Sequence, residues 1–401
     1  MRRPQFVRSI AAAGAASAIG PLTRIPAQAQ SNAPIVLGAA LSMTGIYADG
    51  GKYCLEGYSL AIKHINAKGG VLGRQLALKY YDDQSEPATG ARLYERLIDE
   101  DKVDVIIGPY GTAITVPAAN VAERHKMPMI CPEIADVVLF SRGLRYIFQS
   151  VGPVQSYLFG VLSIAHDRGF KRLAIISPNI AFGHSLTDAV PTIARGFGQA
   201  IVFQEYYPPN TSDYAPLIEK VRAAGPDVVL AMSFPVDSVG VLRALKQADY
   251  APKMFYEAIG ASDPLFTKNV GSDAEGTYSV SCWNFASNSA ENIAFVRDYR
   301  AEYHRDPDYH AATNYSTVYV LGAALKKVGS LDQEKLRDTL ATIQVPTLIG
   351  LYKVDPRTGI QLGYTSYIIQ WQHGKQVVVY PGNVANAQPM IPFPAWAARR
   401  A

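Results

Sequence analysis

Apolar and polar positions along the chain predict the order strand, helix, strand, helix. Residues 35–41 predict a buried strand, and residues 55–65 predict a helix because apolar side chains recur there every three or four positions. Residues 76–81 and 87–100 repeat the pair, and so does the segment 103–120. Because polar loops fall at the strand ends, this part of the chain predicts a doubly wound parallel α/β sheet.

The same rhythm restarts after residue 150. Strands are predicted at 173–177, 201–206, 228–232 and 253–256, and helices at 154–167, 185–195, 214–224 and 239–248. A single open sheet of so many strands is unusual, so we expect two similar lobes.

From residue 276 the order changes. A strand is predicted at 277–283, helices at 290–304, 313–328 and 333–343, and a β tail at 351–380. These elements do not complete a second sheet on their own, so we expect the chain to cross between the lobes. Lobe 1 then comprises residues 30–148 and 277–347, lobe 2 residues 149–276 and 348–385, and residues 386–401 form a C-terminal tail.

The loop after the strand in 103–120 is the first candidate for chemistry. It carries Tyr110, Gly111 and Thr112 between the strand and the helix. In an open α/β sheet a ligand lies beyond the carboxyl end of such a strand, where backbone N–H groups and the helix dipole favour an anion. The simpler alternative is that Gly108-Pro109 only turns the chain.

The N-terminus predicts a secretory signal peptide over residues 1–29. Arg2, Arg3 and Arg8 precede a short Ala-rich apolar run, and Ala27-Gln28-Ala29 offers a small-x-small cleavage site. The arginine pair is off by one residue from a twin-arginine signal, so Sec and Tat export both stay open. We therefore expect a periplasmic protein.

Removal of this segment makes the protein neutral. The whole chain has 38 basic and 34 acidic residues, and the segment holds four Arg and no acid, which leaves 34 against 34. A neutral protein without a basic patch argues against nucleic acid as a partner. Cys54, Cys131 and Cys282 form no C-x-x-C pair, and we expect buried free thiols.

The sequence contains no catalytic or cofactor motif. G-x-S-x-G, H-E-x-x-H, the Walker loop and G-x-G-x-x-G are all missing. His304, Asp306, Asp308 and His310 make one polar cluster, which we interpret as a solvated turn between two helices. Ser185 is interpreted as a helix cap. We expect no enzyme, no cofactor and no metal.

Six segments of the chain together resemble a known family. They are LGAALSMTGIYADGG, INAKGGVLGRQL, YYDDQSEP, VDVIIGPYGT, YEAIGASDPLF with AEGTY, and LIGLYKVDPRTG with YIIQW. In this order they resemble the periplasmic substrate-binding proteins of branched-chain amino acid ABC transporters, over residues 35 to about 380. The resemblance implies the type I binding-protein fold, in which three crossovers, near residues 149, 276 and 348, join two lobes that close on a ligand.

The resemblance also implies a set of ligand-binding residues. They are Tyr110, Thr112, Ala135, Phe182, Glu257 and Tyr315. Thr112 falls at the position of a hydroxyl that holds a ligand carboxylate, and Glu257 at the acidic anchor for a ligand ammonium. Phe182 and Tyr315 match aromatic positions. Tyr47, Phe234 and Trp283 are further aromatic candidates outside this main set, because several of the 24 tyrosines and other rings belong to the core.

One position departs from the family pattern. Ile134-Ala135 replaces the usual Ala-Ser/Thr pair, which removes a hydroxyl from the site. An unreplaced hydrogen bond to a carboxylate costs roughly 1–3 kcal/mol, so a plain α-amino acid is less well supported than the resemblance implies. Asp136 either faces the cleft or caps a helix.

Two functions fit this resemblance. The first is a monomeric solute-binding protein that captures an amino acid, an amide or a small aromatic acid by hinge closure and delivers it to an ABC permease. The second is a sensor that presents its closed state to a membrane receptor or kinase. Contacts from both lobes are required in either case, because a ligand favours the closed state only by its differential affinity for it.

Overall fold

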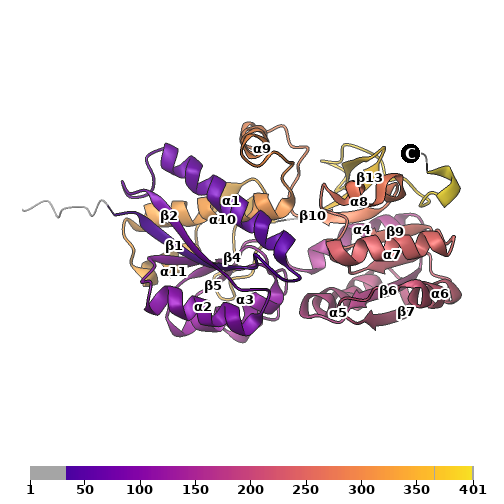
Figure 1. The fold of residues 1–401 in the computed structure, drawn as a ribbon, viewed down its shortest axis with the longest axis horizontal. Helices are drawn as coiled ribbons and strands as arrows, with labels where there is room; N and C mark the ends of the chain where they lie inside the picture. The colour runs from indigo at the N-terminus through magenta and orange to yellow at the C-terminus, as the bar shows by residue number, and fades with distance from the viewer. Residues whose placement is uncertain (1–32, 365, 400–401) are drawn as a thin grey trace, which may run out of the picture. The chain divides into compact units, whose positions relative to one another are not determined.

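The computed structural model describes residues 33–364 and 366–399, and the predicted signal peptide lies outside these residues. A parallel five-stranded sheet forms the core of the first lobe (Figure 1). Its strands, in spatial order, are β2 (Leu76–Asp82), β1 (Ile35–Leu41), β3 (Val105–Ile107), β4 (Met129–Cys131) and β5 (Ile147–Gln149). All four pairings within it are parallel.

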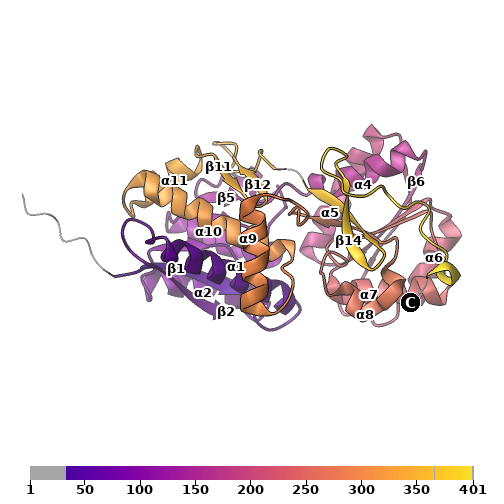
Figure 2. The ribbon, with the colours of Figure 1, turned by 90° about the horizontal axis from the view of Figure 1, so that it is seen from above.

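Helices cover both faces of this sheet (Figure 2). They are α1 (Ala48–Ala67), α2 (Pro87–Asp99), α3 (Thr112–Arg124), α10 (Tyr309–Val328) and α11 (Gln333–Leu340). The apolar face of α2 buries Tyr94 and Leu97, and the Tyr94 hydroxyl donates to the carbonyl of Ile107, which ties this helix to β3. Helices α1 and α10 pack directly against each other.

A seven-stranded sheet forms the core of the second lobe. Its strands, in spatial order, are β14 (Lys375–Tyr380), β13 (Tyr367–Gln372), β10 (Tyr278–Ser281), β9 (Met254–Glu257), β8 (Val228–Ala231), β6 (Arg172–Pro178) and β7 (Ala200–Tyr207). The strands from β10 to β7 are parallel, whereas β13 and β14 pair antiparallel at one edge. The flanking helices are α4 (Gln155–Asp167), α5 (Ala181–Gly196), α6 (Ala215–Ala224), α7 (Pro235–Gln247) and α8 (Phe266–Val270).

The remaining elements are short or lie at the periphery. They are α9 (Ala290–Tyr303), the hairpin β11 (Val345–Thr347) with β12 (Gly350–Tyr352), and the 3-10 turns η1 (Phe140–Arg142), η2 (Gly271–Ala274) and η3 (Trp396–Ala398). No helix in residues 33–364 or 366–399 is both long and apolar enough to cross a bilayer. Cys54, Cys131 and Cys282 are buried and are not joined by disulfides.

The predicted fold class is confirmed, and three details differ. Residues 348–354 were assigned to lobe 2, but Tyr352 and Val354 pack in the core of the first lobe. Residues 277–283 were assigned to lobe 1, but β10 pairs with β9 and β13 in the second sheet. The chain therefore returns to the first lobe after β10, several residues later than the crossover predicted near residue 276. In addition, α1, α5, α7 and α10 each begin at least four residues before their predicted starts.

The packing of α1 against α10 leads to a test of stability. A Cβ atom at Gly57 of α1 would lie 2.4 Å from the carbonyl oxygen of Ala311, whereas one at Gly322 of α10 would lie 3.5 Å or more from its neighbours. We expect Gly57→Ala to lower the free energy of unfolding by about 1–3 kcal/mol through overpacking. Gly322→Ala, the matched control, should raise it by roughly 0.5–1 kcal/mol because alanine favours the helix. Urea unfolding of both variants measures the difference, and equal stability of the two would contradict this packing.

Candidate functional site

The first turns of five helices surround one cavity. Four of these helices, α1, α3, α5 and α7, each follow a parallel strand directly, and the fifth is α10. The residues just before each helix, namely Tyr47, Gly111, Ile180, Phe234 and Asp308, all line the cavity. Because three of the helices belong to the first lobe and two to the second, both lobes contribute walls.

The cavity has two adjoining parts. We call the part lined by Asp49, Asp237, Asp263 and Asp308 the aspartate part, and the part lined by Thr112, Glu133, Ala135 and Phe182 the threonine part. They enclose about 780 and 410 Å³ of space, including space open to solvent. Tyr47, Tyr110, Phe234, Ile259 and His310 line both parts. A space of this size suits a small organic molecule.

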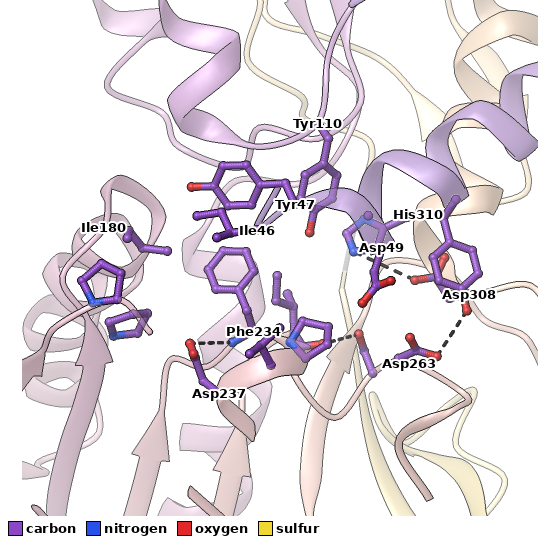
Figure 3. A pocket seen from close by; sticks show the side chains of 18 of the residues that line it. Ile46, Tyr47, Asp49, Tyr110, Ile180, Phe234, Asp237, Asp263, Asp308 and His310 are labelled. Atoms are coloured by element: carbon purple, nitrogen blue, oxygen red, sulfur yellow. Dashed lines mark hydrogen bonds and ion pairs between the residues drawn. The ribbon is translucent and has the colours of Figure 1, made fainter. Parts of the chain in front are cut away.

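Aromatic rings from the two lobes meet at this cavity (Figure 3). The ring centroid of Tyr47 lies 5.9 Å from that of Tyr110 and 6.1 Å from that of Phe234. Phe234 in turn lies 5.9 Å from Phe182. An apolar or aromatic group of a ligand would therefore find rings from both lobes.

The threonine part contains donor groups without a partner. The Thr112 side chain is buried, and its hydroxyl makes no hydrogen bond with any described residue. Thr112 opens α3, and no described side chain caps that helix start. The first N–H groups of a helix have no acceptor within the helix, and the helix dipole favours negative charge there. This end of the cavity is suited to an anion or another strong acceptor.

His310 lies at the junction of the two parts. Its Nδ1 is 2.7 Å from Glu133 Oε2, and Asn314 donates to the other oxygen of Glu133. Burial alone would lower the pKa of His310, but the charges of Glu133 and Asp308 and the hydrogen bond to Glu133 raise it to about 9. His310 is therefore a buried cation at neutral pH.

Asp308 is the helix cap that precedes His310. Its Oδ1 accepts from the N–H of Ala311, and its Oδ2 lies 4.0 Å from His310 Nε2. Burial raises the pKa of Asp308 to about 7, with His310 opposing the shift and Asp263 adding to it. Figure 3 places Asp263 and Asp49 on the same side of the cavity as this pair.

Four of the six predicted site residues come together at the cavity. Tyr110, Thr112, Ala135 and Phe182 all line the threonine part. Tyr47 and Phe234, left outside the main set, line the cavity as well, whereas Trp283 is buried and donates to Asn292. The role of each lining residue in ligand binding stays a prediction.

Glu257 is not at the cavity surface. It is fully buried at the end of β9, and neither carboxylate oxygen has a hydrogen-bond partner among the described residues. Burial, together with the nearby Asp237, raises its pKa well above the usual value. Ile259, Ser262 and Asp263, which follow Glu257 in the chain, line the cavity instead. At the position nearest to the expected anchor, the surface is formed by the apolar side chain of Ile259.

Tyr315 also lies away from the cavity lining. Its hydroxyl is 2.8 Å from His64 Nδ1 and 3.1 Å from the Tyr319 hydroxyl. The lining residues of the same helix are Tyr309 and His310, which stand six and five positions earlier.

The sequence interpretation missed Asp308 and His310. They were assigned to a solvated turn, but both are buried, while His304 and Asp306 of the same cluster are exposed. The difference arises because α10 begins at Tyr309 rather than at residue 313. An Asp just before a run of helix-forming residues is a cap signal, and it was the available clue.

Two other predicted polar groups contact each other across the lobes. Asp136 Oδ2 accepts from the hydroxyl of Ser185, at 2.7 Å, and its Oδ1 accepts from the N–H of Val138. Because α5 begins at Ala181, Ser185 lies inside this helix and does not cap it.

One group of described residues has a geometry that could hold a metal ion. It consists of Glu95, Asp99 and His125, but it is largely exposed, and Arg124 already pairs with Glu95.

Comparison with known proteins identifies the family. Residues 34–376 match the family model described as periplasmic binding protein, so the chain belongs to this family of solute-binding proteins. The chain is 28% identical over 390 residues to Leu/Ile/Val-binding protein homolog 7 of Brucella suis, which covers 91% of this chain and 96% of that protein. It is 27% identical over 377 residues to homolog 8 of Brucella abortus, with coverages of 89% and 93%.

Solved structures show the same fold at lower identity. LivJ of Streptococcus pneumoniae, in complex with isoleucine, has a TM-score of 0.78 at 22% identity and covers 87% of this chain and all of that chain. A solute-binding protein of R. palustris in complex with benzoate also has a TM-score of 0.78, at 19% identity, with coverages of 90% and 97%. A third, from Rhodopseudomonas palustris BisB5 with 3,4-dihydroxybenzoic acid, has the same TM-score at 22% identity, with coverages of 92% and 99%.

The burial of Glu257 leads to a prediction about pH. Because its pKa is raised, the folded protein holds this proton more tightly than the unfolded chain does. The wild type therefore loses stability as pH rises above the unfolded value near 4.5, whereas Gln does not titrate. We expect Glu257→Gln to be about as stable as wild type at pH 4 and increasingly more stable than wild type toward pH 8. We expect its ligand affinity to change less than about twofold, which corresponds to only a few tenths of a kcal/mol. Urea unfolding across this range measures the effect, and a large loss of affinity would return Glu257 to the ligand site.

Proposed function

We propose that this chain is an extracytoplasmic solute-binding protein that captures a small carboxylate with an apolar or aromatic body. Closure of the two lobes holds the solute, and the closed form delivers it to an ABC permease. The observation that carries the proposal is the cavity between the lobes. There the Thr112 hydroxyl and the first N–H groups of α3 have no side-chain acceptor among the described residues.

The charge pattern of the cavity supports a carboxylate rather than a free amine. Several of its acidic side chains already have partners: Asp263 accepts from Tyr53, and Asp237 accepts from the hydroxyls of Tyr207 and Tyr214. Both oxygens of Glu133 are engaged as well. Buried donors left without an acceptor are costly, so a ligand that supplies acceptors gains most from this site.

The apolar walls support the second half of the proposal. Phe182, Phe234 and Ile259 from the second lobe face Tyr47 and Tyr110 from the first. With Glu257 behind the surface, an ammonium has no acidic anchor at that point. The ligands in the related structures, isoleucine, benzoate and 3,4-dihydroxybenzoic acid, all carry a carboxylate, and the two aromatic acids lack an ammonium.

The family and the predicted signal peptide support the proposed location and partner. Members of the family are periplasmic binding proteins, and the homologous Leu/Ile/Val-binding proteins support transport as the role. A chain that binds its solute with both lobes gains differential affinity for the closed state, which a permease can recognise.

A ligand screen tests the proposed function. The mature protein is mixed with isoleucine, leucine, benzoate, 3,4-dihydroxybenzoate and their amides, and thermal unfolding is recorded. A true ligand at about 100 times its Kd should stabilise the protein by about 2.7 kcal/mol. Stronger stabilisation by the carboxylates than by the matching amides is the expected result. If no small solute stabilises the protein, the proposed function fails.

A substitution at Thr112 tests the anion end. Thr112→Val keeps the shape and removes the hydroxyl, and a hydrogen bond to a charged group is worth about 1.5–3 kcal/mol, or roughly 10–150-fold in affinity. The control is Thr187→Val, because Thr187 is also buried with an unpaired hydroxyl but does not line the cavity. Calorimetric titration with the strongest carboxylate from the screen should show the loss only for Thr112→Val. Equal affinities of the two variants would remove Thr112 from the site.

A further inference from the structure

His310 has one ring nitrogen that is not used by the fold. Nδ1 is held by Glu133 at 2.7 Å, but Nε2 is 4.0 Å from its nearest ionic partner, Asp308, which is beyond hydrogen-bonding distance. The side chain is only 7% exposed, and it lines both parts of the cavity. A charged N–H that borders the cavity and has no acceptor within hydrogen-bonding distance in the fold is available to a ligand acceptor.

His310 also lies where the site has lost another donor. Ala135, which lines the same part of the cavity, has no hydroxyl to offer, whereas Thr112 does. Among the described lining residues there is no Lys or Arg, so the imidazolium is the cation that borders the cavity. A charge-assisted hydrogen bond is roughly twice as strong as a neutral one, so one imidazolium can outweigh a missing hydroxyl.

We propose that His310 is a ligand-binding residue whose Nε2–H donates to the carboxylate of the solute, and that Asp308 takes up a proton from solvent when this carboxylate binds. The inference rests on the proposed function. Glu133 acts as a positioning residue, because it orients the ring through Nδ1 and Asn314 orients Glu133 in turn.

The proton uptake follows from the spacing of charges. A carboxylate that accepts from Nε2 must approach Asp308 Oδ2, which lies 4.0 Å from the same nitrogen. Two ionised carboxylates so close together repel each other, so one of them becomes protonated. Asp308 is the one poised to do so, since its pKa is already raised to about 7.

Other titratable groups face His310 or its partners. They are Glu133, Asp263, Tyr110, Tyr309, Tyr53 and Cys54. Burial raises the pKa of Tyr110 and Cys54 well above their usual values, and it also raises that of Tyr53, so all three stay neutral. Burial raises the pKa of Glu133 as well, with His310 opposing the shift.

The sign of the pH effect is therefore defined. Below pH 7 Asp308 is neutral and His310 is charged, so a carboxylate binds best. Above pH 7 binding must draw a proton onto Asp308, and affinity should fall by up to about tenfold per pH unit. Above pH 9 His310 loses its charge, and affinity falls further.

Benzoate and benzamide serve as the matched probes, because they differ in charge but hardly in shape. Calorimetric titration at pH 6 and pH 8, in buffers of different ionisation enthalpy, measures affinity and proton uptake together. For the wild type we expect benzoate affinity to fall from pH 6 to pH 8, with uptake approaching one proton at pH 8 and little at pH 6. Benzamide should show neither effect.

Three variants divide the proposal into parts. His310→Gln should weaken benzoate roughly ten- to a hundredfold and benzamide far less. Asp308→Asn should remove the proton uptake and bind benzoate more tightly than wild type at pH 8. Asn caps helices as well as Asp does, so this variant keeps the start of α10. The control is Asp332→Asn, which makes the same change at the cap of α11, away from the cavity, and should leave affinity and proton uptake unchanged.

Each other outcome has a defined meaning. If benzoate binds the wild type without proton uptake, or if Asp308→Asn leaves the pH profile unchanged, the inference is overturned while the proposed function stands. If the protein binds amines that have no carboxylate, both the inference and the proposed ligand class are overturned, while solute binding itself stands. If benzoate, leucine, isoleucine and 3,4-dihydroxybenzoate all fail to bind, the inference is overturned, and if no solute of any kind binds, the proposed function fails with it.

Discussion

The site depends on the way two parallel sheets direct their helices. A helix follows the carboxyl end of each of these parallel strands. The first turns of α1, α3, α5 and α7 therefore lie at the edges of the sheets that border the cavity. Helix starts present N–H groups without intrahelical acceptors, and a large core on either side holds them in place. The fold thus supplies donors to the cavity before any side chain is considered.

Most of the acidic side chains at the cavity accept hydrogen bonds from protein donors. A count of residue types would describe the cavity as negative, since Asp49, Asp237, Asp263, Asp308 and Glu133 all line it. Four of these five carboxylates, however, already accept from protein donors. Asp237 and Asp263 accept from tyrosines, Asp308 caps α10, and Glu133 is paired with His310. Among the donors, the fold leaves unpaired the Thr112 hydroxyl, the start of α3 and one nitrogen of His310, and these groups favour a ligand with acceptors.

Much of the fold was predictable from sequence, but the site was predictable only in part. Hydrophobic periodicity is set by burial along whole elements, so the order of the main strands and helices was predicted, whereas the short elements β5, α8 and β11 were missed. Helix starts depend on caps and on tertiary packing, and there the prediction was several residues late. That error placed Asp308 and His310 in a solvated turn. The prediction that Glu257 lines the cavity was wrong for another reason. The sequence places a carboxylate at the end of a strand, but the local path of the chain decides whether it points to the cavity or into the core. Here Glu257 is buried, and Ile259 reaches the cavity surface.

The missing hydroxyl at Ala135 and the buried His310 are physically related, because the second can replace the donor that the first lacks. A carboxylate held by a hydroxyl on each of two loops needs no protein charge, because neutral donors and helix starts suffice. With one hydroxyl missing, an imidazolium can restore the donor, but a buried cation requires its own counter-ion, and Glu133 provides it. Asp308 is the consequence of placing that cation at a helix start, since the cap that begins α10 is itself a carboxylate. The exchange of a hydroxyl for a charged ring therefore brings a titratable group into a site that would otherwise be insensitive to pH.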